Sequence, residues 1–339
     1  MTTTEQQLSK IAEEAGIEGG ATALKIVFQR LGATPEGPDP DAWVALTAPG
    51  ASDDLRQRLV AARQAAQVDV ADYAPARLTA LANALTEKNV QGFLVPQADA
   101  HQGEYIASRA QRLHWLTGFA GSAGTALMFK GRTILFVDGR YTLQAGLQFE
   151  DSEVEVRHFM EPPLVNWLLD AGEKGDRIGY DPDLHNVAQI DSMCKILDGS
   201  GIELVALSDN PLDGVWTDQP LPPFAPVVPH PLEYSGQSVD DKLASLGDLI
   251  AEAGADAAVL NQMEAVAWAL NVRGGDVSNT PLIQSFAVLH KDGQADFYVD
   301  RQKFTPDLER HLGNRVTVHN VDKLDEGLKA LGVTNRKVL

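Results

Sequence analysis

Hydrophobic positions in the middle of the chain follow a helical spacing first and a strand spacing afterwards. In "ARLTALANALTEKNVQGFLVP", Leu78, Leu81 and Leu85 fall on one helical face, and residues 92–95 then form a short apolar run. This pattern predicts a surface helix that leads into a short buried strand. Further on, "TALMFKGRTILFVDGR" has two apolar runs around Lys130-Gly131-Arg132, which predicts a β-hairpin.

The same pattern occurs a second time, about 165 residues later. The second hairpin sequence, "FAVLHKDGQADFYVD", has one more residue in its turn than the first, and Trp268 in "VAWALN" matches Trp115 in "LHWLTG". The other matched pairs are Leu78 and Leu243, Leu81 and Leu246, Leu85 and Ile250, Leu94 and Val259, Val95 and Leu260, and Val137-Asp138 and Val299-Asp300. A helix, a strand, a tryptophan and a hairpin in one repeated order indicate an internal duplication.

The duplication predicts an α/β protein with two copies of one unit, each with a mixed sheet. We expect a helical extension over residues 1–72, a first domain over 73–218 and a second over 235–339. Between them, residues 219–234 form an extended linker, since six prolines occur from Pro220 to Pro231. The final "VTNRKVL" is interpreted as the opening of a strand, so the second domain is expected to be incomplete.

Composition narrows the classes of partner. The formal net charge of −19 argues against nucleic acid and anionic membranes, both of which are bound through clusters of Lys and Arg. Cys194, the one cysteine, excludes an internal disulfide and suggests a reducing compartment, and its apolar helical context predicts a buried thiol. The N-terminus resembles no signal peptide and no apolar run is long enough to cross a bilayer, so a cytoplasmic protein is expected.

The stretch "GFAGSAGT", residues 118–125, raises three hypotheses: a phosphate-binding loop, a nucleophile elbow at Ser122, or a glycine turn. The first two need a helix directly after the glycines, and the elbow also needs a histidine such as His101, His114 or His158. A predicted hairpin follows instead. The favoured interpretation is a tight turn whose glycines take positive φ.

Other candidate chemistry is sparse. The eight histidines are scattered without metal-ligand spacing, and the carboxylates mostly occupy helix starts and loops. Asp138 and Asp300 end predicted strands, where they are expected to cap turns. The residues taken alone therefore indicate no catalytic constellation.

Three motifs carry a resemblance to a known family. "WLTGFAGSAGTALMF…TILFVDGRYTLQA", "VWTDQPLPP" and "WALNVRGGDVSNTPLIQSFAVL" closely resemble the N-terminal half of cytosolic-type Xaa-Pro aminopeptidases, or aminopeptidase P. These enzymes belong to the creatinase/aminopeptidase P superfamily of pita-bread metallohydrolases. The resemblance covers residues 73–339 and implies two tandem creatinase-N-like domains with mixed sheets flanked by helices, preceded by a short helical extension.

The resemblance also implies a function for a parent enzyme. Such enzymes remove the N-terminal residue from peptides with proline second, using a third domain that holds two divalent metal ions, usually manganese, through two Asp, one His and two Glu. That domain is absent from this sequence, so the resemblance implies no catalytic and no metal-binding residue here. The expected roles are walling of the substrate cleft and assembly of a homodimer. Alternatives are a stand-alone binding or assembly module and, from a different class, a serine hydrolase that uses Ser122.

Six residues are candidates for the cleft wall. By resemblance, the loop at Phe119, Gly121 and Ser122 forms a lip over the cleft, and Arg140, Arg273 and Asp276 are further candidates. The structural alternative for Arg273 and Asp276 is an ion pair with each other across a turn.

Overall fold

The computed structural model describes residues 5–17, 20, 22–24, 51–56, 58–59, 74–149 and 152–339. The chain divides into two compact units. The first unit comprises residues 67–100 and 109–219, and the second comprises residues 1–66, 101–108 and 220–339.

The first unit contains a mixed six-stranded sheet, in the order β4-β3-β2-β1-β5-β6. The pairs β1–β2 and β2–β3 are antiparallel, and the three outer pairs are parallel. The strands are β1 (Gly92–Pro96), β2 (Gly124–Phe129), β3 (Arg132–Val137), β4 (Val154–His158), β5 (Arg177–Tyr180) and β6 (Glu203–Ala206).

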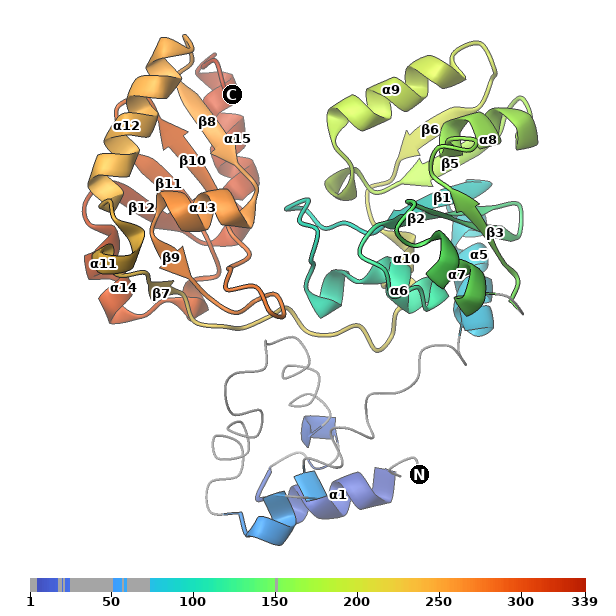
Figure 1. Ribbon diagram of the computed structural model, residues 1–339, viewed down its shortest axis with the longest axis horizontal. Coiled ribbons are helices and arrows are strands. Elements are labelled where there is room, and N and C mark those ends of the chain that lie inside the picture. The colour runs from blue at the N-terminus through green and yellow to red at the C-terminus, as the bar shows by residue number, and fades with distance from the viewer. Residues whose placement is uncertain are drawn as a thin grey trace. The chain divides into compact units, whose positions relative to one another are not determined.

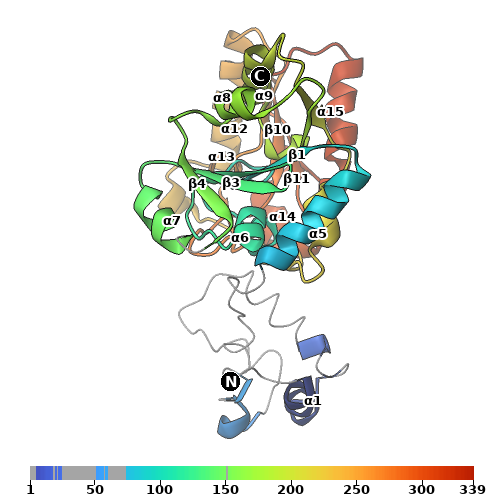
Figure 2. The same ribbon diagram turned by 90° about the vertical axis from the view of Figure 1, so that its right-hand side faces the viewer.

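Helices cover both faces of this sheet, because successive side chains of a strand point to opposite faces. Phe93 and Val95 belong to a core with the first helix group, whereas Leu94 belongs to a core with the second. Figures 1 and 2 show the two helix groups on opposite sides of the sheet. The first group is α5 (Ala74–Glu87), α6 (Arg112–Thr117), α7 (Thr142–Gln148) and α10 (Pro211–Val215), and the second is α8 (Leu164–Ala171) and α9 (Val187–Leu197).

The predicted hairpin is confirmed, and its turn has two residues. Phe129 pairs with Arg132, while Lys130 and Gly131 have φ values of 47° and 79°. Positive φ at both central residues is the geometry of the type I′ turn, whose twist matches that of the flanking strands. Lys130 adopts this conformation although it is not a glycine. Its Nζ lies 2.9 Å from Asp176 Oδ2.

The second unit contains a four-stranded mixed sheet in the order β12-β11-β10-β8. The pairs β8–β10 and β10–β11 are antiparallel and β11–β12 is parallel. At its β8 edge, Ala257 also forms a parallel bridge with Val338. The elements are α12 (Val239–Glu252), β8 (Ala257–Leu260), α13 (Met263–Ala269), β10 (Phe286–His290), β11 (Ala295–Tyr298), α14 (Pro306–Leu312), β12 (Val316–His319) and α15 (Leu324–Val333).

The predicted duplication is therefore confirmed for the helix, strand, tryptophan and hairpin that the two units share. In each sheet, the first strand pairs antiparallel with the hairpin, and the second strand of the hairpin pairs parallel with the next strand. The first strands, β1 and β8, begin at Gly92 and Ala257, 165 residues apart. Trp115 and Trp268 lie on α6 and α13, the helices that follow these strands. Their environments differ, since Trp115 is buried and Trp268 is 51% exposed. Val338 takes the place beside β8 that β5 takes beside β1.

Several shorter elements complete the described chain. The small sheet of β7 (Val228–Pro229) and β9 (Val272–Arg273) joins the end of the proline-rich segment to the second unit. The others are α1 (Glu5–Glu14), α11 (Leu232–Ser235) and the 3-10 helices η2 (Ser108–Ala110), η3 (Pro182–Leu184), η4 (Arg301–Lys303) and η5 (Val321–Lys323). Most of the predicted helical extension over residues 1–72 lies outside the described residues.

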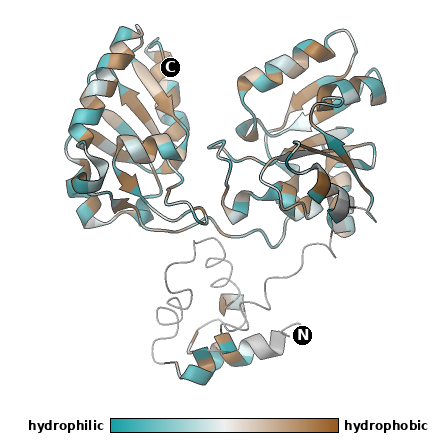
Figure 3. Cartoon of the chain, viewed as in Figure 1, coloured by the Kyte–Doolittle hydropathy of each residue, from teal (hydrophilic) through white to brown (hydrophobic). Residues whose placement is uncertain are grey.

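Hydropathy follows this architecture, since the strands are mostly hydrophobic and the helices carry both hydrophobic and hydrophilic residues (Figure 3). One expectation from the sequence is wrong: Cys194 is exposed, because α9 turns Ile190 and Leu197 toward the core instead. No helix in the described part of the chain has the length and apolar character needed to cross a membrane.

A carboxylate on the second sheet accepts hydrogen bonds from histidines on both neighbouring strands. Asp296 on β11 lies 2.8 Å from His290 Nε2 on β10 and 2.7 Å from His319 Nε2 on β12. Burial alone would raise the pKa of this carboxyl, but the hydrogen bonds from the two imidazoles lower it below its ordinary value.

We expect Asp296 to contribute to acid sensitivity. A carboxyl with a lowered folded-state pKa stabilises the fold above its unfolded pKa of about 3.9, and this contribution is lost as the pH falls through the folded value. The free energy of unfolding, measured in urea between about pH 2 and 6, should fall less steeply with acid in D296N than in the wild type. The exposed Asp248→Asn control should keep the wild-type slope, and equal slopes in all three proteins would contradict the assignment.

Candidate functional site

The glycine loop of the first unit is built around the buried ring of Phe119. Gly118 caps the C-terminus of helix α6: its φ of +82° is left-handed, and its N–H donates to His114 O. Phe119 is fully buried and meets the Tyr141 ring edge-on at 5.6 Å. Its backbone is held as well, because its N–H donates to Thr117 Oγ1 and its carbonyl accepts from His114 Nδ1. Phe119 is thus a core residue that shapes the loop and has no exposed surface of its own.

The other two glycines are required by close packing, and their φ values are not positive. The expectation of positive φ is therefore correct for Gly118 and wrong for Gly121 and Gly124. A Cβ at Gly121 would lie 2.3 Å from Phe119 Cζ and 2.9 Å from Tyr141 Cδ1, and one at Gly124 would lie 3.0 Å from Phe119 Cε1. Real Cβ atoms do not approach ring carbons this closely, so the Phe119 ring selects glycine at Gly121 and disfavours a side chain at Gly124.

Ser122 lies at the tip of the same loop and faces Tyr141. Its Oγ is 2.8 Å from the Tyr141 hydroxyl, and this hydrogen bond lowers the pKa of that phenol. Two of the three histidines suggested as a base bond to other groups: His114 Nδ1 donates to Phe119 O, and His158 Nδ1 accepts from the Met160 N–H. Strand β2 begins at Gly124, so the loop has the predicted strand and not a helix after it. The geometry gives no support to a hydrolase nucleophile at Ser122.

Arg140 is placed beside this pair by a turn at the end of β3. Asp138 accepts from the Arg140 N–H at 2.9 Å and pairs with the Arg140 guanidinium at 2.7 Å. The side-chain hydrogen bond from Arg140 holds the pKa of Asp138 below its ordinary value. The guanidinium also lies 5.4 Å from the Tyr141 ring centre, and its side chain is 60% exposed. Ser122, Arg140 and Tyr141 therefore form one polar group beside the Phe119 loop.

The predicted role of Asp138 as a turn cap is confirmed, and its counterpart behaves in the same way. Asp300 in the second unit accepts from the Gln302 N–H at 2.9 Å. Both aspartates follow the second strand of a hairpin, so the duplicated sequence pattern corresponds to a duplicated turn.

Arg273 and Asp276, in the second unit, do not pair with each other. Asp276 is fully buried and lies 2.7 Å from Lys303 Nζ. Its carboxylate also accepts from the N–H groups of Gln284 at 2.8 Å and Ala225 at 3.3 Å. Burial raises the pKa of Asp276, and the nearby Lys303 charge opposes this effect. Asp276 therefore joins the proline-rich segment, the loop before β10 and η4, a structural role with no exposed carboxylate.

Arg273 is half-buried and directs Nη1 at the backbone. This nitrogen donates to Val272 O at 2.8 Å and to Ala267 O at 3.4 Å, at the C-terminal end of α13. Because the interpretation of an Arg273–Asp276 pair is wrong, Arg273 stays available for another partner.

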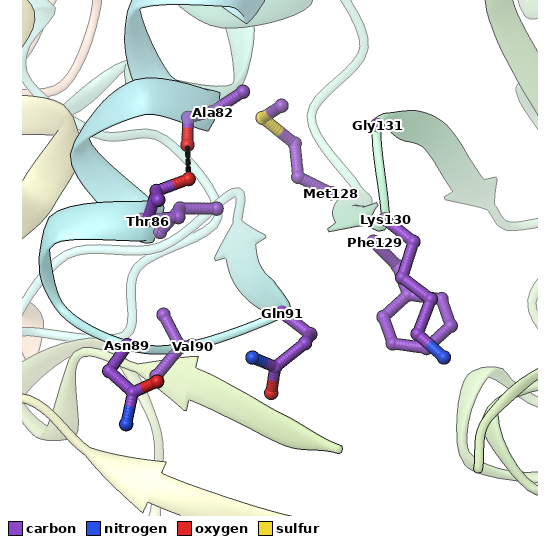
Figure 4. A pocket seen from close by; sticks show the side chains of 10 residues that line it. Ala82, Thr86, Asn89, Val90, Gln91, Met128, Phe129, Lys130 and Gly131 are labelled. Atoms are coloured by element: carbon purple, nitrogen blue, oxygen red, sulfur yellow. Dashed lines mark hydrogen bonds between the residues drawn. The ribbon is translucent and has the colours of Figure 1, made fainter.

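A cavity of about 290 Å³ lies elsewhere in the first unit, between the end of α5 and the β2–β3 turn (Figure 4). Three of its polar side chains have partners: Thr86 donates to Ala82 O, Gln91 accepts from the Arg177 N–H, and Lys130 pairs with Asp176. None of the six residues predicted from the sequence lines it.

Sequence reasoning missed three important side chains. Tyr141, next to Arg140 in "DGRY", was detectable as the aromatic partner of the loop. Trp216 stacks on Trp115 at 5.1 Å, and Lys303 neutralises Asp276 from 27 positions away. Nothing in the local sequence connects either pair.

No group of three or more His, Cys, Asp or Glu side chains is placed to hold a metal ion within the described residues. The dinuclear ligand set that the family resemblance implies for a parent enzyme thus has no match in the described part of this chain.

Comparison with known proteins accounts for both repeats. Two family models described as Creatinase/Prolidase N-terminal domain match residues 77–212 and 218–339. The chain is 34% identical over 264 residues to a probable Xaa-Pro aminopeptidase P of Aspergillus niger, which covers 77% of this chain and 43% of that protein. It is also 34% identical over 255 residues to aminopeptidase P2 of Arabidopsis thaliana. That alignment covers 74% of this chain and 36% of the plant protein.

The similarity extends over both repeats in a solved structure. The X-prolyl aminopeptidase of Caenorhabditis elegans, described as a cytosolic enzyme with a di-nuclear active site, has a TM-score of 0.71 and 28% identity. The match covers 77% of this chain and 45% of that one. The chain therefore spans less than half the length of the relatives it matches.

The packing of Gly121 leads to a first prediction on this site. Gly121→Ala should destabilise the first unit by about 1–3 kcal/mol, because the added methyl group overpacks the Phe119 and Tyr141 rings. Gly146→Ala on α7 is the matched control, since nothing lies within 4 Å of its added Cβ. That variant should be neutral or more stable by about 0.5–1 kcal/mol. Denaturant unfolding compares the two, and equal stability of G121A and wild type would refute the packing account.

The buried ion pair leads to a second prediction. Lys303→Met should destabilise the second unit by about 3–5 kcal/mol, because it leaves the Asp276 carboxylate buried without a counter-ion. The double variant K303M/D276N should recover much of this loss. Lys323→Met removes a similar but exposed pair with Glu326 and should cost little stability, because water screens that pair. Equal losses in K303M and K323M would show that burial of the pair does not matter.

Proposed function

Because the chain belongs to the Creatinase/Prolidase N-terminal domain family, we propose that it forms the two-domain N-terminal portion of an Xaa-Pro aminopeptidase. Such an enzyme removes the N-terminal residue from peptides with proline in second position. In this proposal, the residues of this chain wall the substrate cleft and contribute to assembly, while the catalytic centre lies outside them.

The observation that carries the proposal is the match of both repeats to a family described as Creatinase/Prolidase N-terminal domain. The two matches cover residues 77–212 and 218–339, and the described side chains form no metal-binding group. Metal-assisted hydrolysis needs its ligands held together on one rigid scaffold, around two cations about 3.5–4 Å apart. The similarity to enzymes more than twice as long supports the view that this scaffold lies in the rest of the protein.

The Phe119 loop is the proposed lip of the cleft in the first unit. Its support is that a buried aromatic ring and two closely packed glycines hold the loop rigid, while Ser122 and Arg140 remain at its surface. Rigid placement of polar groups is what a substrate-positioning surface requires. Phe119 and Gly121 act by shaping this loop, and Asp276 acts by holding the second unit together.

The remaining features follow the family. We propose a cytoplasmic homodimeric enzyme with two divalent cations, usually manganese, and domains at residues 73–218 and 235–339 joined by the segment 219–234. The description of the nematode enzyme as cytosolic and di-nuclear supports the compartment and the number of metals. Hard carboxylate and imidazole ligands would suit manganese.

The test is an activity assay on the 339-residue chain. Release of the N-terminal residue from a peptide with proline second should not exceed the metal-free blank when manganese is added, and calorimetry should detect no tight manganese binding. A control peptide with alanine second reports on contaminating aminopeptidases. Manganese-dependent turnover of the proline peptide alone would contradict the proposal.

Coding DNA beyond Leu339 distinguishes the stand-alone module from the larger enzyme. An open frame with two Asp, one His and two Glu in the family's order supports the larger enzyme. A stop codon directly after Leu339 in the intact gene supports the binding or assembly module.

A further inference from the structure

Four basic side chains gather around Asn271 in the second unit. His230 follows β7, Lys242 lies on α12, Arg273 lies in β9 and His311 lies on α14. Strand β7 pairs with β9 and contacts α14, while α12 and β9 both contact α13, so distant parts of the sequence meet here. Asn271 organises the group: its carbonyl accepts from the His230 N–H at 2.7 Å and its Oδ1 accepts from Lys242 Nζ at 2.7 Å.

The C-terminal end of α13 explains part of this gathering. The last carbonyls of a helix lack partners within it and carry partial negative charge, so cations stabilise them. Lys242 Nζ donates to Trp268 O at 2.9 Å, His311 Nε2 to Leu270 O at 3.1 Å, and Arg273 Nη1 to Ala267 O. These bonds use one nitrogen of each side chain.

The positive charge that remains has no carboxylate partner. Within the described residues, none of the four forms an ion pair, although the chain carries a net charge of −19 and Arg112 and Arg140 each pair with an aspartate. The Nε and Nη2 groups of half-buried Arg273 donate to no described residue. Burial, and then repulsion from Arg273, Lys242 and His311, lowers the pKa of His230. Burial and the Arg273 charge likewise lower the pKa of Lys242.

Exposed aromatic rings border the same cluster. Trp268 is 51% exposed, with Lys242 Nζ 4.4 Å from its ring centre, and Tyr234 is 71% exposed, with its ring 6.0 Å from that of His230. Arg, Trp and Tyr are the side chains that most often dominate binding surfaces. The planar guanidinium of an arginine can donate two parallel hydrogen bonds to the two oxygens of a carboxylate.

We propose that Arg273, with His230 and His311 beside it, binds a carboxylate group of a peptide, while Trp268 and Tyr234 contact the neighbouring apolar side chains. The ligand carboxylate would be either a peptide C-terminus or an Asp or Glu side chain. The proposal goes beyond a role in walling a cleft and does not depend on that role, because it rests on the charges and donors of this cluster alone.

Three synthetic peptides distinguish the sources of the carboxylate. They are acetyl-Pro-Phe as the free acid, acetyl-Pro-Phe amide, and acetyl-Glu-Pro-Phe amide. Binding to the full 339-residue chain is followed by calorimetry and by NMR of the Arg273 Nε–H group. We expect the free acid, the Glu peptide or both to bind at least about tenfold more tightly than the neutral amide, because only they engage the guanidinium. Binding should tighten from about pH 7.5 to 5.5 as His230 gains its proton, while the ligand stays ionised.

Matched variants complete the test. Arg273→Gln should weaken binding of the favoured acid at least about tenfold, and Arg310→Gln, which removes an exposed arginine of α14 that pairs with Asp307, should leave it unchanged. His230→Gln keeps the capping bonds of α13 and should reduce the pH dependence of binding. This variant tests the site independently of any misfolding of R273Q. Equal affinity for acids and amide, no binding of any peptide, or equal affinity in R273Q and R310Q would each overturn the proposal.

Discussion

Parallel pairing at the outer edges of each sheet determines the order of nearly every element. Antiparallel strands can be joined by a two-residue turn, as β2 and β3 are, but parallel neighbours need a crossover that returns the chain to the same end of the sheet. In the first unit, α7 joins the parallel neighbours β3 and β4, α9 joins the parallel neighbours β5 and β6, and α8 carries the chain from β4 to β5 on the far side of β1. In the second unit, α14 and α15 occupy the places of α7 and α8. The alternation of hairpin and crossover helix is therefore a requirement of the mixed sheet, and it explains why the two copies agree in element order.

The sequence motifs that most strongly suggest a catalytic or binding site contain mostly residues that pack in the core. In "GFAGSAG", glycines surround the Phe119 ring, and in "VRGGD", a Cβ at Gly274 would lie 1.9 Å from Ile283 Cδ1 while Asp276 is sealed against Lys303. Some glycines are required because a neighbouring side chain leaves no room for a Cβ, and others because the backbone has a positive φ. A sequence alone does not distinguish the two cases. The polar groups that these motifs leave at least partly exposed are Ser122 and Arg140 in one unit and Arg273 in the other.

The sequence was sufficient for the fold and insufficient for the site. Regular spacing of hydrophobic residues located α5, β1 and the first hairpin, and the 165-residue offset located their counterparts. This was possible because periodic burial requires hydrophobic residues at regular positions in the local sequence. The pairing of Arg273 with Asp276 was predicted from proximity in sequence, but Lys303 is brought to Asp276 by tertiary structure. Burial of Cys194 was predicted from an apolar run, but which face of α9 meets the sheet depends on α8 and β6. Contacts between residues far apart in the sequence produce no such local pattern.

The uneven burial of tryptophan gives the two units separate optical properties. Trp115, Trp167 and Trp216 of the first unit are almost completely enclosed, and Trp115 is in contact with both Trp216 and the Arg77 guanidinium. Trp268, the tryptophan described in the second unit, is half-exposed and lies against an ammonium group. Indole emission shifts to longer wavelength in water and is quenched by nearby cations and stacked rings. Among the described tryptophans, the long-wavelength edge of the emission therefore belongs to Trp268, and the short-wavelength edge to the three enclosed rings of the other unit.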